Sequence, residues 1–321
     1  MNYIKNLVIC IMFYCAMSTS LKAQDSLVIV FWNVENFFDH VDGGTGDSDK
    51  EFSSQGSRHW TKSKFLAKCD AVAKSLLWIG EEYGRMPDVV GLAEVENRNV
   101  LVKLINNTLL RKYDYRIMHY ESMDRRGIDV ALLYRESSFR KIAASVTVPK
   151  HDGIPLATRD ILQVCLQDRM GQTVNMIVNH HPSKYGGSKV SEGRRASAMM
   201  TLKGICDSLI SIGQDRIIAM GDFNDTPDGQ QFGLLDGVLV NRADSLFRAG
   251  EGTIRYQGRW ELIDMFLTTP DISSIMDIAY IPFLMTYEKK YPGHKPLRTY
   301  LGPRYTGGVS DHCPIVLMLE Q

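Results

Sequence analysis

Short apolar segments recur along the chain and predict a series of β-strands. They are rich in β-branched and aromatic residues, and they are bounded by Gly, Pro, Asp or Asn, which is the usual pattern of strands in a globular protein. The segments that fit this pattern are 26–32, 88–93, 115–119, 129–134, 161–166, 173–179, 216–220 and 265–267.

Between some of these strands, apolar residues recur at three- and four-residue steps and predict helices over 61–80, 100–112 and 194–212. Because strands and helices interleave, the pattern predicts an α/β or α+β fold layered around β-sheets, within one domain. Two long segments, 40–60 and 283–309, are rich in Gly, Asp, Lys and Tyr. Loops of that length in a compact domain are usually functional or disordered.

The first 23 residues differ from the rest and predict a signal peptide. Lys5 precedes an apolar run of about a dozen residues, and small and polar residues follow up to Ala23. The run is short for a bilayer span of about 20 residues, which disfavours a membrane anchor. Lipid attachment at Cys15 is also disfavoured, because the bulky Tyr14 precedes it. We therefore expect residues 24–321 to form an exported protein, periplasmic or secreted, with no integral membrane segment.

The composition fits a large globular core but not a strongly basic protein. The chain has 321 residues, of which 44% are hydrophobic. Loss of residues 1–23 removes Lys5 and Lys22 and no acids, which leaves 37 − 2 = 35 basic against 37 acidic side chains, a formal balance of −2. Proteins that wrap nucleic acid usually carry a basic surface, so any contact with a polyanion must come from a local patch.

Four cysteines remain after that loss: Cys69, Cys165, Cys206 and Cys313. Export permits disulfides, and four cysteines allow three complete pairings. All four lie in apolar segments and none belongs to a CxxC pair, so we favour buried free thiols over disulfides and over a zinc site built from these cysteines.

Polar residues suited to a metal–phosphate site follow one predicted strand after another. They are Asn33 and Glu35, Glu94 and Glu96, His180 and His181, Asp222 and Asn224, Asp264, and Asp311 and His312. A single instance would be ordinary turn chemistry, because Asp and Asn favour strand ends. Six instances that combine oxygen ligands with histidines indicate a site on a rigid sheet.

The ligand types also indicate the metal. Carboxylates and amides without thiolates suit Mg²⁺, Mn²⁺ or Ca²⁺ rather than zinc. Such an ion polarises a phosphoryl oxygen and stabilises the leaving oxygen. A histidine in such a site needs an acidic partner to fix its charge, and Asp264 is the candidate partner of His312.

The stretch "GDFNDTPD" (221–228) divides into two parts. Asp222 and Asn224 alternate at a strand end, which places both side chains on one face and Phe223 on the other, toward the core. We interpret Asp225 and Asp228 as turn and cap residues.

Seven motifs occur in the order expected of one known family. They are "FWNVENFFD", "VVGLAEVEN", "RRGIDVALLYR", "VNHHPSKYGG", "MGDFND", "ELIDMFL" and "GGVSDHCPI". With them the sequence resembles the DNase I-like endonuclease/exonuclease/phosphatase family from about Leu27 to Leu319. The combination of GDFN with SDH is what makes the resemblance specific. It implies an α/β fold that is a four-layer sandwich of two mostly antiparallel β-sheets flanked by helices, with the site at one edge.

The resemblance also implies roles for individual residues. Glu94 is similar to the principal metal ligand of the family, with Asn33, Glu35 and Asp311 as further metal- or water-holding groups. Asp222 resembles the aspartate that orients or deprotonates the attacking water, and Asn224 the asparagine that binds the phosphate. His180 resembles the phosphate-contacting histidine, and His312 the second histidine, paired with Asp264. The implied reaction is in-line attack of water on a phosphoester without a covalent enzyme intermediate, with Mg²⁺ (or Mn²⁺ or Ca²⁺) as cofactor.

Two positions depart from the family pattern. Many members contact phosphate through a tyrosine or arginine in the middle of the chain, where "DRRGIDVAL" offers Arg126 and, as an alternative, Asp129. His181 directly follows His180, which leaves open which of the two faces the phosphate. We expect Arg126, Lys184 and Arg298 to bind substrate, because Lys184 follows the histidine motif and Arg298 lies in a basic, tyrosine-rich segment before Ser310.

The leading hypothesis is an exported, monomeric, divalent-metal-dependent phosphodiesterase that acts as a nuclease on DNA or RNA. The alternative keeps the chemistry but changes the substrate to a phospholipid head group or an inositol phosphate, as in sphingomyelinase-like or phosphoinositide-phosphatase-like relatives. A non-catalytic binding protein on the same fold is disfavoured, because neither GDFN nor SDH lacks a member.

Overall fold

The computed structural model describes residues 26–44, 46–184 and 188–319, with the backbone alone for 188–190. The predicted signal peptide (1–23), including Cys15, lies outside these residues.

Two six-stranded β-sheets form the centre of the molecule. The strand order of the first is β15 (Ser274–Ile278), β20 (Ile315–Leu319), β1 (Leu27–Phe37), β2 (Val89–Val95), β4 (Asp129–Arg135) and β3 (Tyr115–His119). The order of the second is β11 (Val240–Asn241), β14 (Asp264–Thr268), β10 (Ile217–Asp222), β9 (Thr173–His180), β8 (Ile161–Asp168) and β5 (Phe139–Thr147). In each sheet the middle pair is parallel, β1 with β2 and β9 with β10, and the other pairings are antiparallel.

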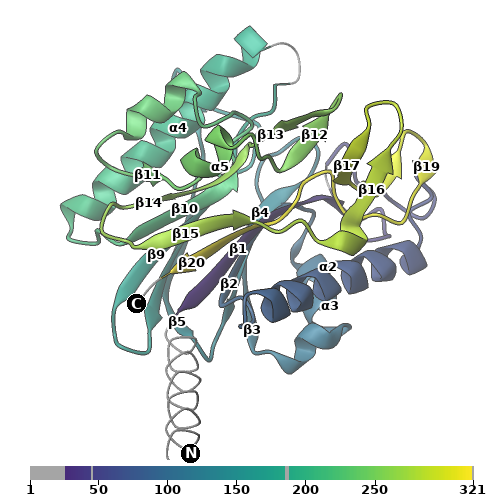
Figure 1. Cartoon of the computed structure of the whole chain (residues 1–321), viewed down its shortest axis with the longest axis horizontal. Helices are drawn as coiled ribbons and strands as arrows, with labels where there is room; N and C mark the ends of the chain where they lie inside the picture. Colours follow the sequence, from purple (N-terminus) through teal and green to yellow (C-terminus); the bar gives the residue numbers. More distant parts are fainter. Residues whose placement is uncertain (1–25, 45, 185–187, 320–321) are drawn as a thin grey trace, which may run out of the picture.

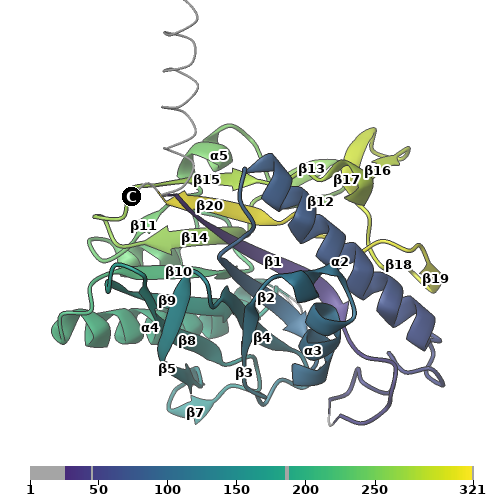
Figure 2. The same ribbon diagram turned by 90° about the horizontal axis from the view of Figure 1, so that it is seen from below.

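Helices cover the outer face of each sheet, which gives four layers (Figure 1). The first sheet is covered by α2 (Lys62–Glu82) and α3 (Arg98–Asn106), and the second by α4 (Ser188–Ser211). The turned view in Figure 2 shows the same order of layers. The short helices are η1 (Leu109–Lys112), η2 (Gln230–Leu235), α5 (Asp244–Arg248) and η3 (Pro282–Leu284). The predicted four-layer sandwich of two mostly antiparallel sheets is confirmed.

The alternation of side chains along β1 explains why two cores form. Val28, Val30 and Trp32 belong to the core beneath α2 and α3, whereas Ile29 and Phe31 belong to the core between the sheets. Successive residues of a strand point to opposite faces, so one fully apolar strand serves both layers. The run "LVIVFW" is therefore apolar without interruption, as expected for a strand buried on both sides.

Most predicted elements are present, with boundaries shifted at several ends. The helix predicted over 61–80 is α2, and Thr61 caps it by accepting a hydrogen bond from the amide of Lys64. The helix predicted over 100–112 is wrong in one respect: it is divided into α3, whose C-cap is Asn107, and η1, which Thr108 caps by accepting a hydrogen bond from the amide of Leu110. Strands β5, β15 and β20 were not among the predicted segments.

The segment 283–309 is not an irregular loop, contrary to expectation. It contains two hairpins, β16 (Met285–Glu288) with β17 (Gly293–Pro296) and β18 (Tyr300–Leu301) with β19 (Arg304–Tyr305). Two more small hairpins pair β6 (Lys150–His151) with β7 (Ile154–Pro155) and β12 (Ile254–Tyr256) with β13 (Arg259–Glu261). Residues 40–60 contain turns anchored by the buried rings of Phe52 and Trp60.

The four cysteines of the described chain are buried free thiols, which confirms the prediction. In the part of the chain that the structure describes, no helix combines the length and apolar character needed to cross a bilayer.

Candidate active site

The carboxyl ends of the four central strands supply most of the predicted site residues. Asn33 and Glu35 lie in β1, Glu94 in β2, and His180 and Asp222 are the last residues of β9 and β10. Asp222 lies opposite His180 on one side and opposite Asp264 of β14 on the other. Because parallel strands end at the same edge of a sheet, the two middle pairs bring polar side chains from distant parts of the sequence together.

The backbone leaves regular strand geometry where these residues occur. Glu35, Asn36, Glu94 and Asn224 have φ values of 47°, 49°, 63° and 51°, in the left-handed region that non-glycine residues seldom adopt. The pairing register shifts at the same places, between Asn33 and Phe37 and between Ala93 and Val95. Such bulges redirect side chains and are common beside active sites. Each non-glycine residue held in the left-handed region costs about 1–3 kcal/mol of folding free energy.

A buried histidine–aspartate pair lies at the centre of the edge. The Nδ1 atom of His312 lies 2.7 Å from Oδ2 of Asp264, and the hydroxyl of Thr253 donates to the same carboxylate oxygen. Burial alone would lower the pKa of His312, but the Asp264 carboxylate outweighs it and raises that pKa well above its ordinary value. His312 therefore carries a positive charge at neutral pH, and its Nε2 atom lies 3.8 Å from Oδ2 of Asp222.

Asp222 is held in place by two amides. The side-chain amide of Asn33 donates to Oδ2 at 3.0 Å, and the backbone amide of Asn224 donates to Oδ1 at 2.9 Å. Burial, followed by the nearby charge of Asp264, raises the pKa of Asp222 to about 7, although His312 and the two amides oppose the shift. A carboxylate with a pKa near neutrality is suited to act as a general base.

His180 lies on the other side of the same carboxylate, with its Nε2 atom 3.5 Å from Oδ2 of Asp222. Burial, together with the charges of Arg159 and Arg126, lowers the pKa of His180 well below its ordinary value, so the ring is neutral. Its Nδ1 atom has no hydrogen-bond partner among the described residues. His181 faces the core instead, with its ring centroid 4.9 Å from that of Phe223. The structure thus places the first histidine of the pair, rather than the second, beside Asp222.

Glu94 forms a two-point ion pair with Arg126. The two guanidinium nitrogens lie 3.1 Å from Oε1 and 2.9 Å from Oε2, and the backbone amide of Asn36 donates to Oε2 at 2.8 Å. Burial favours the protonated acid, but these donors outweigh it and lower the pKa of Glu94 to about 2. Glu94 is therefore ionised at neutral pH.

Glu35 and Asp311 share a second arginine. Arg298 donates to Oε1 of Glu35 at 2.8 Å and lies 3.2 Å from Oδ2 of Asp311, while the backbone amide of Thr299 donates to Oε2 of Glu35 at 3.1 Å. Burial and the charge of Asp311 raise the pKa of Glu35 despite Arg298 and Lys68. The carboxylates of this edge are thus crowded, and two guanidinium groups offset their charge.

The ligand types at this edge suit a divalent cation. Glu94, Glu35, Asn33 and Asp311 offer only oxygen and amide ligands, which suits Mg²⁺, Mn²⁺ or Ca²⁺. Arg126 and Arg298 already place positive charge against these carboxylates, and their side chains are 40% and 49% exposed, so both have room to move aside. Among the described residues, the ligand atoms of Glu94, Glu35 and Asp311 do not all lie within 4.8 Å of one another, so an ion would have to draw these side chains together. The ligand atoms of Asp222, Asp264 and His312 do lie within that distance, but Nδ1 of His312 is already in a short contact with Asp264.

The side chains of Lys184 and Asn224 contact neighbouring protein groups instead of the other predicted site residues. The ammonium group of Lys184 lies 3.5 Å from Oδ1 of Asp225 and pairs with it. The side-chain amide of Asn224 donates to the backbone oxygen of His181 at 2.9 Å. Asp225, which we interpreted as a turn residue, also accepts a hydrogen bond from Gln231 and therefore ties this turn to η2.

Sequence reasoning did not identify several residues that support the site. Ser310 donates to the backbone oxygen of Asn33 at 2.6 Å and accepts from the amide of His312 at 2.9 Å, so it joins two parts of the site. Lys68 is fully buried beneath Glu35 and donates to its backbone oxygen. Ser310 could have been inferred from its place in the SDH motif. Nothing in the sequence distinguishes Lys68 from other lysines on a predicted helix.

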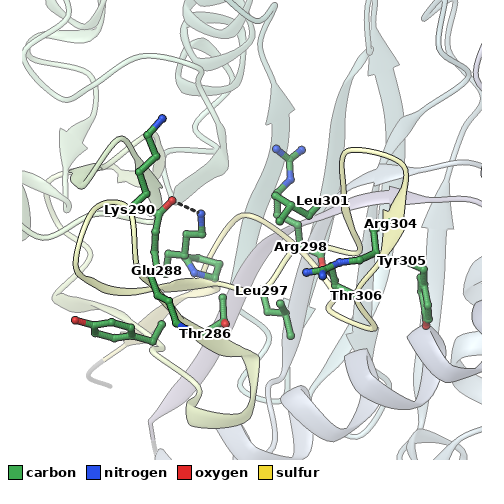
Figure 3. A pocket seen from close by; sticks show the side chains of 13 residues that line it. Thr286, Glu288, Lys290, Leu297, Arg298, Leu301, Arg304, Tyr305 and Thr306 are labelled. Atoms are coloured by element: carbon green, nitrogen blue, oxygen red, sulfur yellow. Dashed lines mark hydrogen bonds and ion pairs between the residues drawn. The ribbon is translucent and has the colours of Figure 1, made fainter.

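A pocket of about 780 Å³ adjoins Arg298 between the two hairpins of 285–305. Figure 3 shows Glu288 and Lys290 on one side and Arg298, Arg304 and Tyr305 on the other. Its charged lining consists of Lys289, Lys290, Lys295, Arg298 and Arg304 against Glu288. Tyr287 is exposed, whereas Tyr300 is buried against Trp60.

Comparison with solved structures returns proteins of the same fold at low sequence identity. An endonuclease/exonuclease/phosphatase family protein from Bacteroides thetaiotaomicron is 15% identical, with a TM-score of 0.59 over 92% of this chain and 97% of that one. The human Nocturnin catalytic domain is 14% identical, with a TM-score of 0.57 over 92% and 94% of the two chains. A mannosyl-6-phosphatase from B. thetaiotaomicron is 13% identical, with a TM-score of 0.57 over 91% and 99%.

No curated protein matches the sequence. The sequence model of the endonuclease/exonuclease/phosphatase family matches residues 28–321, which include almost all of the residues that the structure describes. With the fold and the ordered motifs, this match shows that the chain belongs to the endonuclease/exonuclease/phosphatase family.

Proposed function

We propose that this protein is a divalent-metal-dependent phosphodiesterase that hydrolyses nucleic acid by in-line attack of water, without a covalent enzyme intermediate. The observation that carries the proposal is the arrangement of Asp222 between His180 and the His312–Asp264 pair, beside a cationic pocket that begins at Arg298.

Each residue of the arrangement has a distinct task. Asp222 accepts the proton of the attacking water, because its pKa of about 7 makes it an effective base and its two amide partners fix its direction. His312 places a positive charge beside the phosphoryl oxygens, and Asp264 maintains that charge. Neutral His180 offers a ring N–H to a phosphoryl oxygen.

A divalent ion held by Glu94, with Glu35, Asn33 and Asp311, would polarise the phosphoryl group and stabilise the leaving oxygen. Ionised Glu94 is ready to bind such an ion, since its pKa is about 2. Arg126 and Arg298, once displaced from these carboxylates, are free to contact phosphate oxygens in two-point geometry.

The pocket favours a polymer over a small monoester. Five basic side chains against one acid give the lining a formal charge of 5 − 1 = +4, and Lys295 with Glu288, 2.8 Å apart, forms its one internal ion pair. Such an array next to the site can bind further phosphates of a polymer beside the one that reacts. This local patch is what a protein with an overall balance near neutrality needs to bind nucleic acid.

The second candidate is a phosphoesterase for a phospholipid head group, an inositol phosphate or a sugar phosphate. The overall charge balance of −2 after loss of residues 1–23 favours it, because a dedicated polyanion binder is usually basic. One solved relative is a mannosyl-6-phosphatase, which shows that the fold accommodates a small phosphomonoester in at least one protein.

A substrate panel tests the proposal. We expect the purified protein with Mg²⁺ or Mn²⁺ to cut DNA or RNA faster than sphingomyelin vesicles, inositol phosphates or mannose 6-phosphate. Asp222→Ala and His312→Ala should abolish hydrolysis, whereas Asp228→Ala, an exposed acid in the same stretch, should retain it. Hydrolysis of the lipid or small esters alone would assign the second function, and full activity of the Asp222 and His312 variants would refute the catalytic assignment.

We further propose that the protein is exported and acts as a monomer. Fractionation of the producing cells and N-terminal sequencing of the product test export, with Gln24 as the expected first residue and an intact Met1 in the cytoplasm as the contrary result. Size-exclusion chromatography with light scattering tests the oligomeric state.

A further inference from the structure

A second group of potential metal ligands lies outside the site described above. It consists of His119, Glu121 and Asp129, whose ligand atoms all lie within 4.8 Å of one another. His119 is the last residue of β3 and Asp129 is the first residue of β4, so the group spans the two ends of the connection 120–128.

His119 has a buried ring nitrogen that makes no hydrogen bond to any residue that the structure describes. Its side chain is 2% exposed, and Nε2 lies 3.2 Å from Oδ2 of Asp129. Nevertheless, Nε2 has no hydrogen-bond partner among the described residues, so the ring nitrogen does not point at that oxygen. Two atoms that each lie 2.0–2.1 Å from one tetrahedral ion are separated by about 3.4 Å. The observed separation is close to that value.

The carboxylates of the group are held close together. Oδ1 of Asp129 accepts the amide of Ser122 at 2.9 Å, which directs Oδ2 toward His119. The carboxylate of Glu121 lies beside that of Asp129, and one oxygen of each lies within 4.8 Å of a ring nitrogen of His119. Glu121 is exposed, so the group has a path to solvent.

One further acid, Asp160, lies near the group. Asp160 is close enough for Asp129 to act on its charge, and its Oδ1 atom is buried with no partner among the described residues. Arg159 does not compensate, because its guanidinium lies 3.1 Å from Asp124 and 2.6 Å from the backbone oxygen of His181. Asp129 thus has two further carboxylates near it, those of Glu121 and Asp160, and one imidazole, that of His119.

We propose that His119, Glu121 and Asp129 bind a second divalent cation of the transition-metal class, best matched by Zn²⁺. One imidazole with two carboxylates suits zinc, whereas a site for Mg²⁺ or Ca²⁺ is built from oxygen ligands alone. The exposed side of Glu121 leaves the fourth position to water. This site does not depend on which phosphoester the protein cuts.

The ion has a structural task. It ties together both ends of the connection 120–128, which carries Arg126 against Glu94 and Asp124 against Arg159. A cation that fixes this connection therefore positions Arg126 beside the proposed active site, although it touches neither the substrate nor the reacting atoms.

Metal titration of matched variants tests the proposal. The purified protein is stripped with a chelator, and Zn²⁺ binding is measured by calorimetry and by metal content after gel filtration. We expect His119→Gln and Glu121→Gln each to weaken one class of Zn²⁺ sites by at least about tenfold. Glu94→Gln should leave that class intact, and so should Glu136→Gln, an exposed acid at the other end of β4.

The outcomes separate the possibilities. Unchanged Zn²⁺ binding in both the His119 and Glu121 variants would overturn the site. Tighter binding of Mg²⁺ or Ca²⁺ than of Zn²⁺ to this class would overturn the choice of metal. If His119→Gln fails to fold, as judged by circular dichroism, Glu121→Gln decides, because its side chain is exposed and its loss removes no core packing.

Discussion

Replacement of Asp264 by Asn should shift the pH optimum of hydrolysis to lower pH and reduce the maximal rate. The variant keeps the volume of the side chain but removes the charge that lies 2.7 Å from Nδ1 of His312. At an effective dielectric constant of about 20, the attraction of the imidazolium is about 6 kcal/mol to Asp264 at 2.7 Å and about 4 kcal/mol to Asp222 at 3.8 Å. Asp311, whose Oδ1 atom lies 3.9 Å from Nε2, adds about 4 kcal/mol at the same dielectric constant, so Asp264 supplies the largest single part of the field that keeps His312 charged.

Loss of Asp264 lowers two pKa values at once. His312 loses the partner that raises its pKa, and Asp222 loses the negative neighbour that raises its own. Both limbs of the pH–rate profile should move to the acid side. At pH 7.5 the neutral imidazole no longer stabilises the phosphoryl charge, and we expect the rate to fall by about 10²–10⁴, or about 3–5 kcal/mol in activation free energy.

The assay is kcat against pH on a chromogenic phosphodiester and on DNA, with metal at saturation. Thr253→Val, which removes only a hydroxyl that donates to Asp264, serves as a milder variant and should show a smaller change in the same direction. Equal melting temperatures would exclude unfolding as the cause. An Asp264→Asn enzyme with the wild-type optimum and rate would refute the role assigned to the pair.

Three further predictions concern stability and metal affinity. His181 is buried and its folded pKa is about 3, because burial, Arg159 and Arg195 disfavour its charged form. The unfolded chain therefore binds a proton as the pH falls through about 6.5 while the folded chain does not, so about 3 kcal/mol of stability is lost between pH 7.5 and pH 4. His181→Phe should flatten urea-unfolding free energies over this range, and an equally steep curve would contradict the assignment. Arg298→Ala removes a cation that competes for Glu35, and calorimetry should show Mg²⁺ affinity raised roughly two- to tenfold; weaker binding would mean that Arg298 does not compete. Gly221→Ala would place a Cβ 2.4 Å from the backbone oxygen of Asn179 and should destabilise the protein by about 1–3 kcal/mol, whereas Gly204→Ala in α4 meets no atom within 4 Å and should stabilise it by about 0.5–1 kcal/mol. Thermal denaturation should show a lower melting temperature for Gly221→Ala and a higher one for Gly204→Ala. Equal changes in melting temperature would contradict the packing argument.

The central strands and main helices were predictable because their patterns are local. The apolar run of β1 and the stripe of α2 follow from single windows of sequence. The end of β1 was harder: the prediction stopped at Trp32, but the strand continues to Phe37 through the bulge that contains Glu35 and Asn36. Polar residues inside a strand have the same sequence pattern as a turn, so the sequence alone did not show that the strand continues.

The motifs predicted one contact between candidate site residues, whereas other contacts could not be inferred from the sequence. The pairing of His312 with Asp264 across 48 residues matches the expectation. In contrast, the ion pair of Arg126 with Glu94 depends on a register between strands that no local window contains. Lys184 and Arg298 were chosen for the same reason, a basic residue near a motif, yet only Arg298 contacts predicted metal ligands.

The pairing of β1 with β20 has a consequence for the order of events during synthesis. Leu27 pairs with Leu319, a separation of 319 − 27 = 292 residues, so β1 can pair with β2 early but receives its second partner only at the end of synthesis. At about 5–20 residues per second, β1 waits on the order of 15–60 s for it. His312 arrives only three residues ahead of β20 and reaches Asp264 when that strand docks. All strands of the second sheet are thus synthesised before His312, and the candidate site is incomplete until then. Hydrolytic activity should therefore first appear when β20 has been added.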